Sequence, residues 1–250
     1  MKLLKEMSQK DLKIIKLIVL DVDGVLVPRG TEIQQKGNFL KIKTKKIPKK
    51  EIELIKELYA NGFHININSG RGLYMLQKMF FSILPFVSLT YENGSATWIK
   101  GRVYQHTNSF AELREVEEKL RKIKSKSIKG FEPKEFIISI HCKRRIRSIE
   151  KVVAEYKQLY YLWNGEAYDI GLKSKQTKVV GLKNLIKILR IKNKNTLALG
   201  DNYNDKDMIN AAGVSISADK KRLKADFFMP LSKKELPAQK LLSKILGIIK

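Results

Sequence analysis

The hydrophobic residues of this chain fall into short apolar runs that alternate with segments of helical periodicity. Mainly apolar runs cover 14–20, 63–67 and 196–199, and each of them stops at polar residues. Apolar residues recur at helical spacing in 49–60 and 179–190. Strands that alternate with helices in this way predict an α/β fold with a parallel sheet, and ligands bind beyond the carboxyl ends of such strands.

The spacing of the pattern predicts a second, smaller α/β domain. Ser69 and Lys178, two candidate site residues, are 109 positions apart, whereas one further helix and strand would need roughly 30 residues. The surplus contains a hairpin pattern at 97–105 and apolar stripes at helical spacing at 113–123 and 146–159. The predicted division is the first part of the core (1–94), an inserted α/β cap (95–172) and the second part of the core (173–250).

Pairs of aspartates follow two of the apolar runs. Asp21 and Asp23 come directly after the first run, and Asp201 and Asp205 come just after the last. Four carboxylates at one edge of a sheet would repel one another and raise each other's pKa unless a hard cation bound among them. A single Asp-x-Asp-Gly turn is usually ordinary loop chemistry, but two acidic clusters at strand ends favour a Mg²⁺ site.

Two further signals indicate a site for an anion. The turn Ser69-Gly70-Arg71 follows the apolar run 63–67 and offers a hydroxyl, free backbone N–H groups and a helix N-terminus. Taken alone, it is common helix-cap chemistry. Lys178 stands at the start of the predicted helix 179–190. A positive charge at that end is unfavourable for the helix dipole, which indicates that this lysine has a role other than local stability. Lys175 is the alternative for this position.

In order and context these motifs resemble the haloacid dehalogenase superfamily of aspartate-nucleophile phosphatases. The segments that carry the resemblance are DVDG at 21–24, the turn at Ser69, Lys178, and GDNYND at 200–205. Val179 stands where the family usually has glycine after the lysine, which is why Lys175 stays open. The insert is placed like the type-two α/β caps of subfamily IIB and resembles those of archaeal phosphoglycolate phosphatases and Cof-like sugar phosphatases.

The resemblance implies a Rossmann-like core and a two-step phosphatase that depends on Mg²⁺. Asp21 would be the nucleophile that forms an aspartyl-phosphate, and Asp23 the general acid and base. The implied metal-binding residues are Asp21, Asp23, Asp201 and Asp205, with Asp23 binding through its backbone carbonyl and Asp205 either directly or through water. The implied substrate-binding residues are Ser69, Gly70, Arg71, Lys178 and Asn204.

The implied substrate is a small phosphate monoester. Phosphoglycolate or a related hydroxy-acid phosphate is the first choice, and a sugar phosphate is the second. A basic segment would suit a substrate carboxylate if it entered the cleft, although in a lysine-rich chain such a segment is more often solvated surface; it comprises His141, Lys143, Arg144, Arg145 and Arg147. A mutase similar to phosphomannomutase, which returns the phosphoryl group to the sugar, is an alternative reading of the same site.

The net charge raises an alternative of another class. Fifty Lys and Arg against 25 Asp and Glu give +25, which is typical of a protein that binds nucleic acid. The basic residues are dispersed, apart from 41–50 and 143–147, and no arrangement of aromatic residues among them suggests a stacking platform. We therefore expect a small phosphorylated metabolite as partner and no nucleic acid.

Composition and hydropathy also bear on the cellular setting. The lone Cys142 allows no internal disulfide, and no uninterrupted apolar stretch reaches 18 residues. These features favour a cytoplasmic enzyme without membrane contact. A homodimer remains open.

Overall fold

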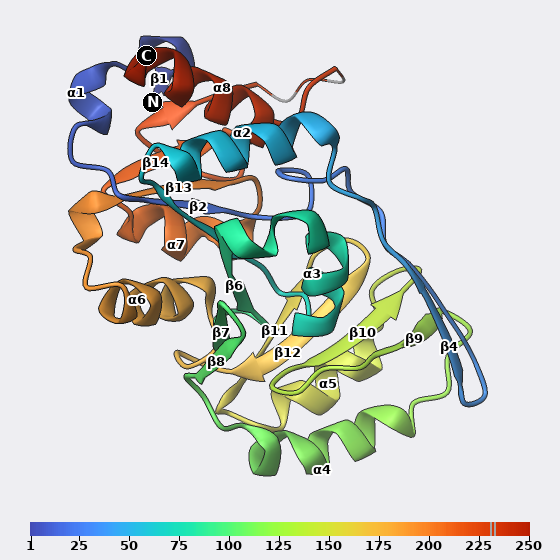
Figure 1. The fold of residues 1–250 in the computed structure, drawn as a ribbon. Helices are drawn as coiled ribbons and strands as arrows, with labels where there is room; N and C mark the ends of the chain where they lie inside the picture. Colours follow the sequence, from blue (N-terminus) through green and yellow to red (C-terminus); the bar gives the residue numbers. More distant parts are fainter. Residues whose placement is uncertain (231, 233) are drawn as a thin grey trace.

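The structure is a computed structural model that describes residues 1–230, 232 and 234–250, and within them it contains a nine-stranded sheet and a smaller four-stranded sheet (Figure 1). Neighbouring strands of the large sheet pair in parallel, except β6 with β7 and β7 with β8. This architecture confirms the predicted α/β class. Across the large sheet the strands are β1 (Lys2–Leu3), β15 (Phe227–Phe228), β14 (Val214–Ser217), β13 (Thr196–Gly200), β2 (Leu17–Leu20), β5 (His64–Asn68), β6 (Val87–Tyr91), β7 (Ala96–Ile99) and β8 (Arg102–Gln105).

Helices cover both faces of the large sheet: α2 (Lys49–Ala60) and α8 (Pro237–Ile249) on one, and α6 (Lys178–Ile188) and α7 (Lys206–Ala211) on the other (Figure 1). The central strand β2 serves both layers. Its Ile18 and Leu20 belong to the apolar cluster that includes α2 and α8, whereas Leu17 and Val19 belong to the cluster with α6 and α7. A strand buried on both faces reads as a continuous apolar run, as the sequence does here.

The remaining core elements are short. They are α1 (Gln9–Leu12), α3 (Leu73–Met79) and the 3₁₀ turns η1 (Leu4–Glu6), η2 (Phe81–Phe86), η3 (Asn193–Asn195) and η4 (Tyr203–Asp205).

The small sheet is antiparallel and has its own apolar core. Its strands, in spatial order, are β11 (Leu159–Trp163), β12 (Ala167–Leu172), β10 (Ile138–Cys142) and β9 (Ile128–Glu132). The helices α4 (Phe110–Arg121) and α5 (Arg147–Ala154) pack on it through the predicted stripes, which include Leu113, Val116 and Ile149. The second predicted stripe was too long, because α5 ends at Ala154 and Leu159 begins β11.

The hairpin at 97–105 lies in the large sheet and not with the insert, where the sequence had placed it. Its first strand, β7, pairs with β6, with Thr97 opposite Thr90. A hairpin pattern does not reveal which sheet edge it joins, because that choice depends on contacts remote in sequence. The elements of the small sheet and its two helices run from Phe110 to Leu172; the domain boundaries at 94/95 and 172/173 stay a prediction.

Several contacts tie the small sheet to the core, and two of them involve segments of the core that are far apart in the sequence. The carboxylate of Glu92, at the end of β6, accepts backbone N–H groups of Glu135, Phe136 and Ile137 at 2.6 to 3.1 Å. The second contact is a hairpin of β3 (Glu32–Lys36) and β4 (Phe39–Lys43), which sequence analysis missed. It reaches from the core to β9, where Gln35 Oε1 accepts the N–H of Phe131 at 3.1 Å (Figure 1).

Candidate active site

The carboxyl ends of three adjacent strands form the floor of the candidate site. Strand β2 lies between β13 and β5 and pairs in parallel with both. Asp21 directly follows β2, Ser69 directly follows β5, and Asp201 directly follows β13. Because parallel strands end at the same edge, residues from three distant parts of the chain meet there.

Lys178 enters this group from the first position of α6. Its Nζ lies 2.5 Å from Oδ1 of Asp21 and 2.5 Å from Oδ1 of Asp205, and the side chain is buried. The backbone carbonyl of Lys178 accepts a hydrogen bond from the side-chain amide of Asn68 at 3.0 Å, which fixes the start of the helix against β5. Lys175, the alternative, is exposed.

Burial and crowding shift the pKa values of these groups. Burial, and then the charge of Asp205, raise the pKa of Asp21 to about 8, against the opposing effect of Lys178. Burial also raises the pKa of Asp201, and the hydrogen bond from Arg29 partly offsets it. Burial alone would lower the pKa of Lys178, but Asp205 and Asp21 raise it, so that the ammonium stays charged. Strongly perturbed groups that share a cleft are typical of catalytic sites.

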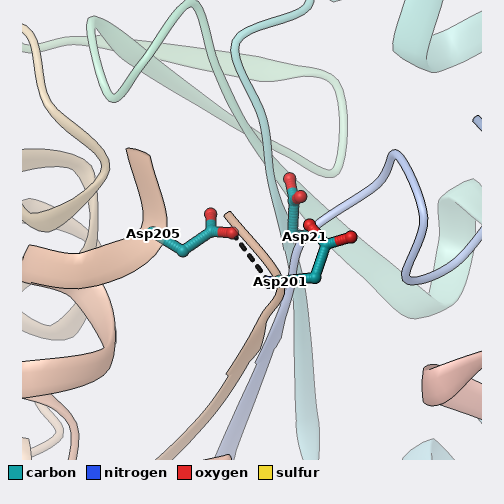
Figure 2. Close-up of side chains that lie close together, drawn as sticks. All are labelled: Asp21, Asp201 and Asp205. Atoms are coloured by element: carbon teal, nitrogen blue, oxygen red, sulfur yellow. Dashed lines mark hydrogen bonds between the residues drawn. The ribbon is translucent and has the colours of Figure 1, made fainter. Parts of the chain in front are cut away.

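The three aspartates can also hold a cation. Asp21, Asp201 and Asp205 offer carboxylate oxygens that all lie within 4.8 Å of one another (Figure 2). Oδ1 of Asp201 is buried and has no hydrogen-bond partner among the described residues. Oδ2 of Asp205 accepts the backbone N–H groups of Asp201 and Asn202, both at 3.0 Å. Hard oxygen donors with an unsatisfied buried oxygen fit Mg²⁺, and the contacts of Asp205 suit it to anchoring this loop as well.

Asp23 is held differently, by Arg71. The guanidinium donates to both carboxylate oxygens of Asp23, at 2.8 and 2.5 Å, and also to the hydroxyl of Thr31. The Asp23 side chain is 37% exposed and lines the cavity above the three aspartates. Its carboxylate is not part of the group of three. The predicted metal ligand from Asp23 is its backbone carbonyl, which stays a prediction.

The other predicted substrate-binding residues line the same cavity. Ser69 Oγ accepts the N–H of Arg71 at 3.2 Å, which shapes the turn. A side chain at Gly70 would be tightly enclosed, since a Cβ there would lie 3.0 Å from side-chain oxygens of Asn93 and Asp169. Oδ1 of Asn204 is buried without a hydrogen-bond partner in the described part of the chain, so a ligand could occupy it.

Sequence analysis missed more than half of the residues that line this cavity. From the core it missed Arg29, whose Nη2 donates to Oδ2 of Asp201 at 2.5 Å. It also missed most of a wall from the small sheet: Glu132, Lys134, Ser139, Asn164, Glu166, Ala167 and Asp169. His141 belongs to the same wall and was named in the sequence analysis as part of the basic segment. The one available signal was the alternation in β10, where Ser139 and His141 interrupt apolar neighbours. Nothing local distinguished the other residues from ordinary surface charges.

The basic segment after β10 is mostly remote from the cavity. Only His141 lines it, whereas Lys143, Arg144, Arg145 and Arg147 are exposed and are absent from its lining. The interpretation of these four residues as solvated surface therefore fits the structure.

Comparison with known proteins identifies the family to which this chain belongs. The model of the haloacid dehalogenase-like hydrolases matches residues 18–141 and 85–224 of the chain. The chain belongs to this family. The match confirms the family predicted from the motifs and the predicted class of enzyme, a phosphoric monoester hydrolase of the haloacid dehalogenase type.

Solved structures with the same fold span almost the whole chain. A phosphatase of this superfamily from Bacteroides thetaiotaomicron is 19% identical, with a TM-score of 0.70, and the alignment covers 94% of this chain and 96% of that one. A subclass IIB sugar phosphatase is 19% identical, with a TM-score of 0.65 and coverage of 93% and 99%. A protein from Plasmodium vivax described as a HAD/Cof-like hydrolase is 21% identical, with a TM-score of 0.68 and coverage of 96% and 99%. No curated protein matches the chain.

None of the helices in the described part of the chain is long and apolar enough to span a bilayer.

Proposed function

We propose that this haloacid dehalogenase-like hydrolase is a Mg²⁺-dependent phosphatase that hydrolyses a small phosphate monoester through an aspartyl-phosphate. The observation that carries the proposal is the position of Lys178, whose ammonium bridges Asp21 and Asp205 at 2.5 Å each. A buried ammonium between carboxylates can hold a nucleophile and an incoming phosphoryl group in one place, and phosphoryl transfer depends mainly on such positioning and charge.

Each residue has a step that its position supports. An oxygen of Asp21 attacks phosphorus while the bond from phosphorus to the alcohol oxygen breaks, which leaves the phosphoryl group on Asp21. Asp23, next to the open part of the cavity, gives a proton to the departing alkoxide. It then takes a proton from the water that attacks the aspartyl-phosphate, so that inorganic phosphate and free Asp21 result.

The surrounding groups bind the phosphoryl oxygens. Lys178 supplies positive charge, and the turn of Ser69 and Gly70 supplies a hydroxyl and backbone N–H groups, with Asn204 near by. Mg²⁺ would be held by Asp21 and Asp201, with Asp205 as a further ligand or as the anchor of the loop and with the backbone carbonyl of Asp23. When bound, it supplies positive charge to the phosphoryl oxygens and relieves the repulsion among the carboxylates.

The sequence analysis indicates two substrate classes for such a phosphatase, a hydroxy-acid phosphate such as phosphoglycolate and a sugar phosphate. The exposed position of the basic segment removes one argument for a substrate with a carboxylate. A phosphosugar mutase uses the same first step but returns the phosphoryl group to sugar, so that no inorganic phosphate accumulates.

The test is phosphate release from a panel of phosphate monoesters, with Mg²⁺ and after chelation. We expect release that requires Mg²⁺ and falls by at least about a thousandfold in Asp21→Asn. Asp207→Asn, which changes an exposed aspartate on α7, is the matched control and should keep full activity. Appreciable release by a folded Asp21→Asn protein contradicts the mechanism, and conversion of a sugar phosphate to its isomer without free phosphate identifies a mutase.

A further inference from the structure

The wall that the small sheet contributes to the cavity is acidic. It carries the carboxylates of Glu132, Glu166 and Asp169 against one ammonium, that of Lys134. This wall lines the same cavity as Asp21 and Asp23, so we expect the alcohol part of a phosphate monoester bound at Asp21 to meet it.

Acceptors of the protein itself surround the ammonium of Lys134. Its Nζ lies 2.8 Å from the carbonyl oxygen of Gly70, 3.4 Å from Oδ1 of Asp169 and 3.7 Å from Oε1 of Glu132. The side chain is 3% exposed. The first two contacts are within hydrogen-bond distance, and the third is a salt bridge too long for a hydrogen bond. Lys134 therefore braces the wall against the Ser69–Arg71 turn and does not offer a free positive charge.

Glu132 has spare capacity as a hydrogen-bond acceptor. Its Oε2 lies 2.9 Å from Nε2 of His141, whereas its Oε1 is buried and accepts no hydrogen bond within the described residues. Burial by itself would raise the pKa of Glu132, but Lys134 and His141 outweigh burial and lower it to about 2, so the group is a carboxylate at neutral pH. A buried carboxylate oxygen without a donor is costly, and a donor on a ligand would relieve that cost.

Asp169 is a second carboxylate of the wall, and it lies close to the turn proposed to bind phosphate. Its Oδ1 accepts the hydroxyl of Ser139 at 2.6 Å. Its Oδ2 is directed towards Gly70, where an added Cβ would lie 3.0 Å from it. Acceptors therefore lie along the wall from Glu132 to the turn that binds phosphate.

We propose that Glu132 and Asp169 select a phosphate monoester whose alcohol carries hydrogen-bond donors, as hydroxyl or ammonium groups, and exclude one whose alcohol carries a carboxylate. This inference rests on the proposed phosphatase function. A donor satisfies Glu132 Oε1, whereas a carboxylate would meet two fixed carboxylates of the same charge. The order of substrates expected from the sequence is thereby reversed, since the hydroxy-acid phosphates fall behind.

One cation of the cavity could oppose this selection. Arg29 is 43% exposed and pairs with Asp201, which is also a proposed metal ligand, so a cation on Asp201 would compete with it. An Arg29 released in this way could bind a substrate carboxylate. The test therefore includes Arg29→Gln.

Three matched probes differ in one terminal group on a two-carbon alcohol: 2-hydroxyethyl phosphate, phosphoethanolamine and phosphoglycolate. A longer set, glucose 6-phosphate, glucosamine 6-phosphate and 6-phosphogluconate, reaches further along the wall. Dissociation constants are measured by calorimetry with Mg²⁺ on Asp21→Asn protein, so that binding is ranked whether or not the wild-type protein turns the probes over. Phosphate release by wild-type protein, measured in parallel, reports on the proposed function separately.

In at least one set we expect the hydroxyl or ammonium probe to bind about tenfold or more tightly than the carboxylate probe. Adding Glu132→Gln should reduce that preference by about tenfold, because Gln keeps the shape but loses the charge. Glu135→Gln, an exposed carboxylate three residues away, is the control and should leave the preference unchanged. The inference is wrong if the carboxylate probes bind equally or more tightly in both sets, above all if Arg29→Gln abolishes that binding. It is also wrong if Glu132→Gln and Asp169→Asn both leave the preference for the hydroxyl or ammonium probe unchanged.

Discussion

Arg71 holds both carboxylate oxygens of Asp23, at 2.8 and 2.5 Å, across 48 positions of sequence. A planar guanidinium can make this paired contact, whereas an ammonium of the same charge cannot. Asp23, the proposed general acid and base, is thus held in one orientation by Arg71, which lies in the turn after β5.

Replacement of Arg71 by Lys should therefore reduce catalysis while keeping the charge. We expect a fall in kcat for phosphate release of about ten- to a hundredfold, because Asp23 loses its fixed orientation. Arg145→Lys is the matched control, since Arg145 pairs with Glu150 on the exposed side of the insert, and it should behave as wild type. An unchanged kcat in Arg71→Lys would show that the paired contact is not needed for the proton transfers.

Lys178 and Lys175 can be separated by the same substitution at each position. Lys178→Met removes the ammonium that bridges Asp21 and Asp205 and leaves the buried carboxylates unopposed. We expect phosphate release to fall by at least about a hundredfold. Lys175→Met, at an exposed position, should keep wild-type activity. Steady-state kinetics on both variants checks this, and a larger loss in Lys175→Met would reassign the phosphate-binding lysine.

Two glycines with the same backbone conformation allow a test of how α6 is positioned. Gly94 (φ +83°) and Gly101 (φ +85°) both lie in the left-handed region, so an alanine costs a similar backbone strain at each, about 1 kcal/mol. A Cβ at Gly94 would also lie 2.3 Å from the carbonyl oxygen of Thr177 and 2.6 Å from the N of Gly181, whereas a Cβ at Gly101 meets no atom within 4 Å.

Gly94→Ala should therefore be the less stable variant, because the start of α6, which carries Lys178, must move. Overpacking of this kind costs about 1 to 3 kcal/mol beyond the shared strain. For a chain of this size, we expect its midpoint of thermal unfolding to lie about 2 to 12 °C below that of Gly101→Ala. Equal midpoints would mean that the contact between Gly94 and α6 yields without cost.

Cys142 should be unreactive in the folded protein. It is buried in the small sheet, and burial raises the pKa of its thiol to about 11. The thiolate is the reactive form, so at pH 8 very little of it is present. We expect no reaction with a chromogenic disulfide reagent at pH 8 without denaturant, and one thiol per chain after unfolding in guanidinium. Rapid reaction of the native protein would show that this part of the insert opens readily.

Some of the site could be read from the chain because local patterns carried it. Asp21 and Asp201 stand at the ends of apolar runs, and parallel strands bring such ends together, so their meeting was predictable. Lys178 could be chosen over Lys175 only through a resemblance, since both are lysines near the start of the same helix. The structure distinguishes them by burial and by the 2.5 Å contacts of Lys178.

The wall that the small sheet contributes to the cavity could not be predicted from the sequence. Glu132 and Asp169 lie on strands of an antiparallel sheet, where alternate residues face opposite sides. A one-residue shift in the register of either strand would turn its side chain to the other face of the sheet. Their place in the lining of the cavity depends on how the small sheet docks on the core, through contacts such as those of Glu92 and of the hairpin of β3 and β4. The sequence also misplaced the hairpin of β7 and β8, since its pairing partner, β6, is chosen by tertiary contacts.

By itself, then, the sequence determined the parallel core, the presence of an insert and the acidic edge at Asp21 and Asp201, because apolar periodicity and strand ends are local properties. Only the tertiary structure decided which charges face the cavity. It directs Glu132 inwards and leaves Arg145 in solvent, although both are ordinary charged residues in the sequence. That decision depends on sheet register and on the docking of two sheets, which arise from contacts between residues far apart in the chain.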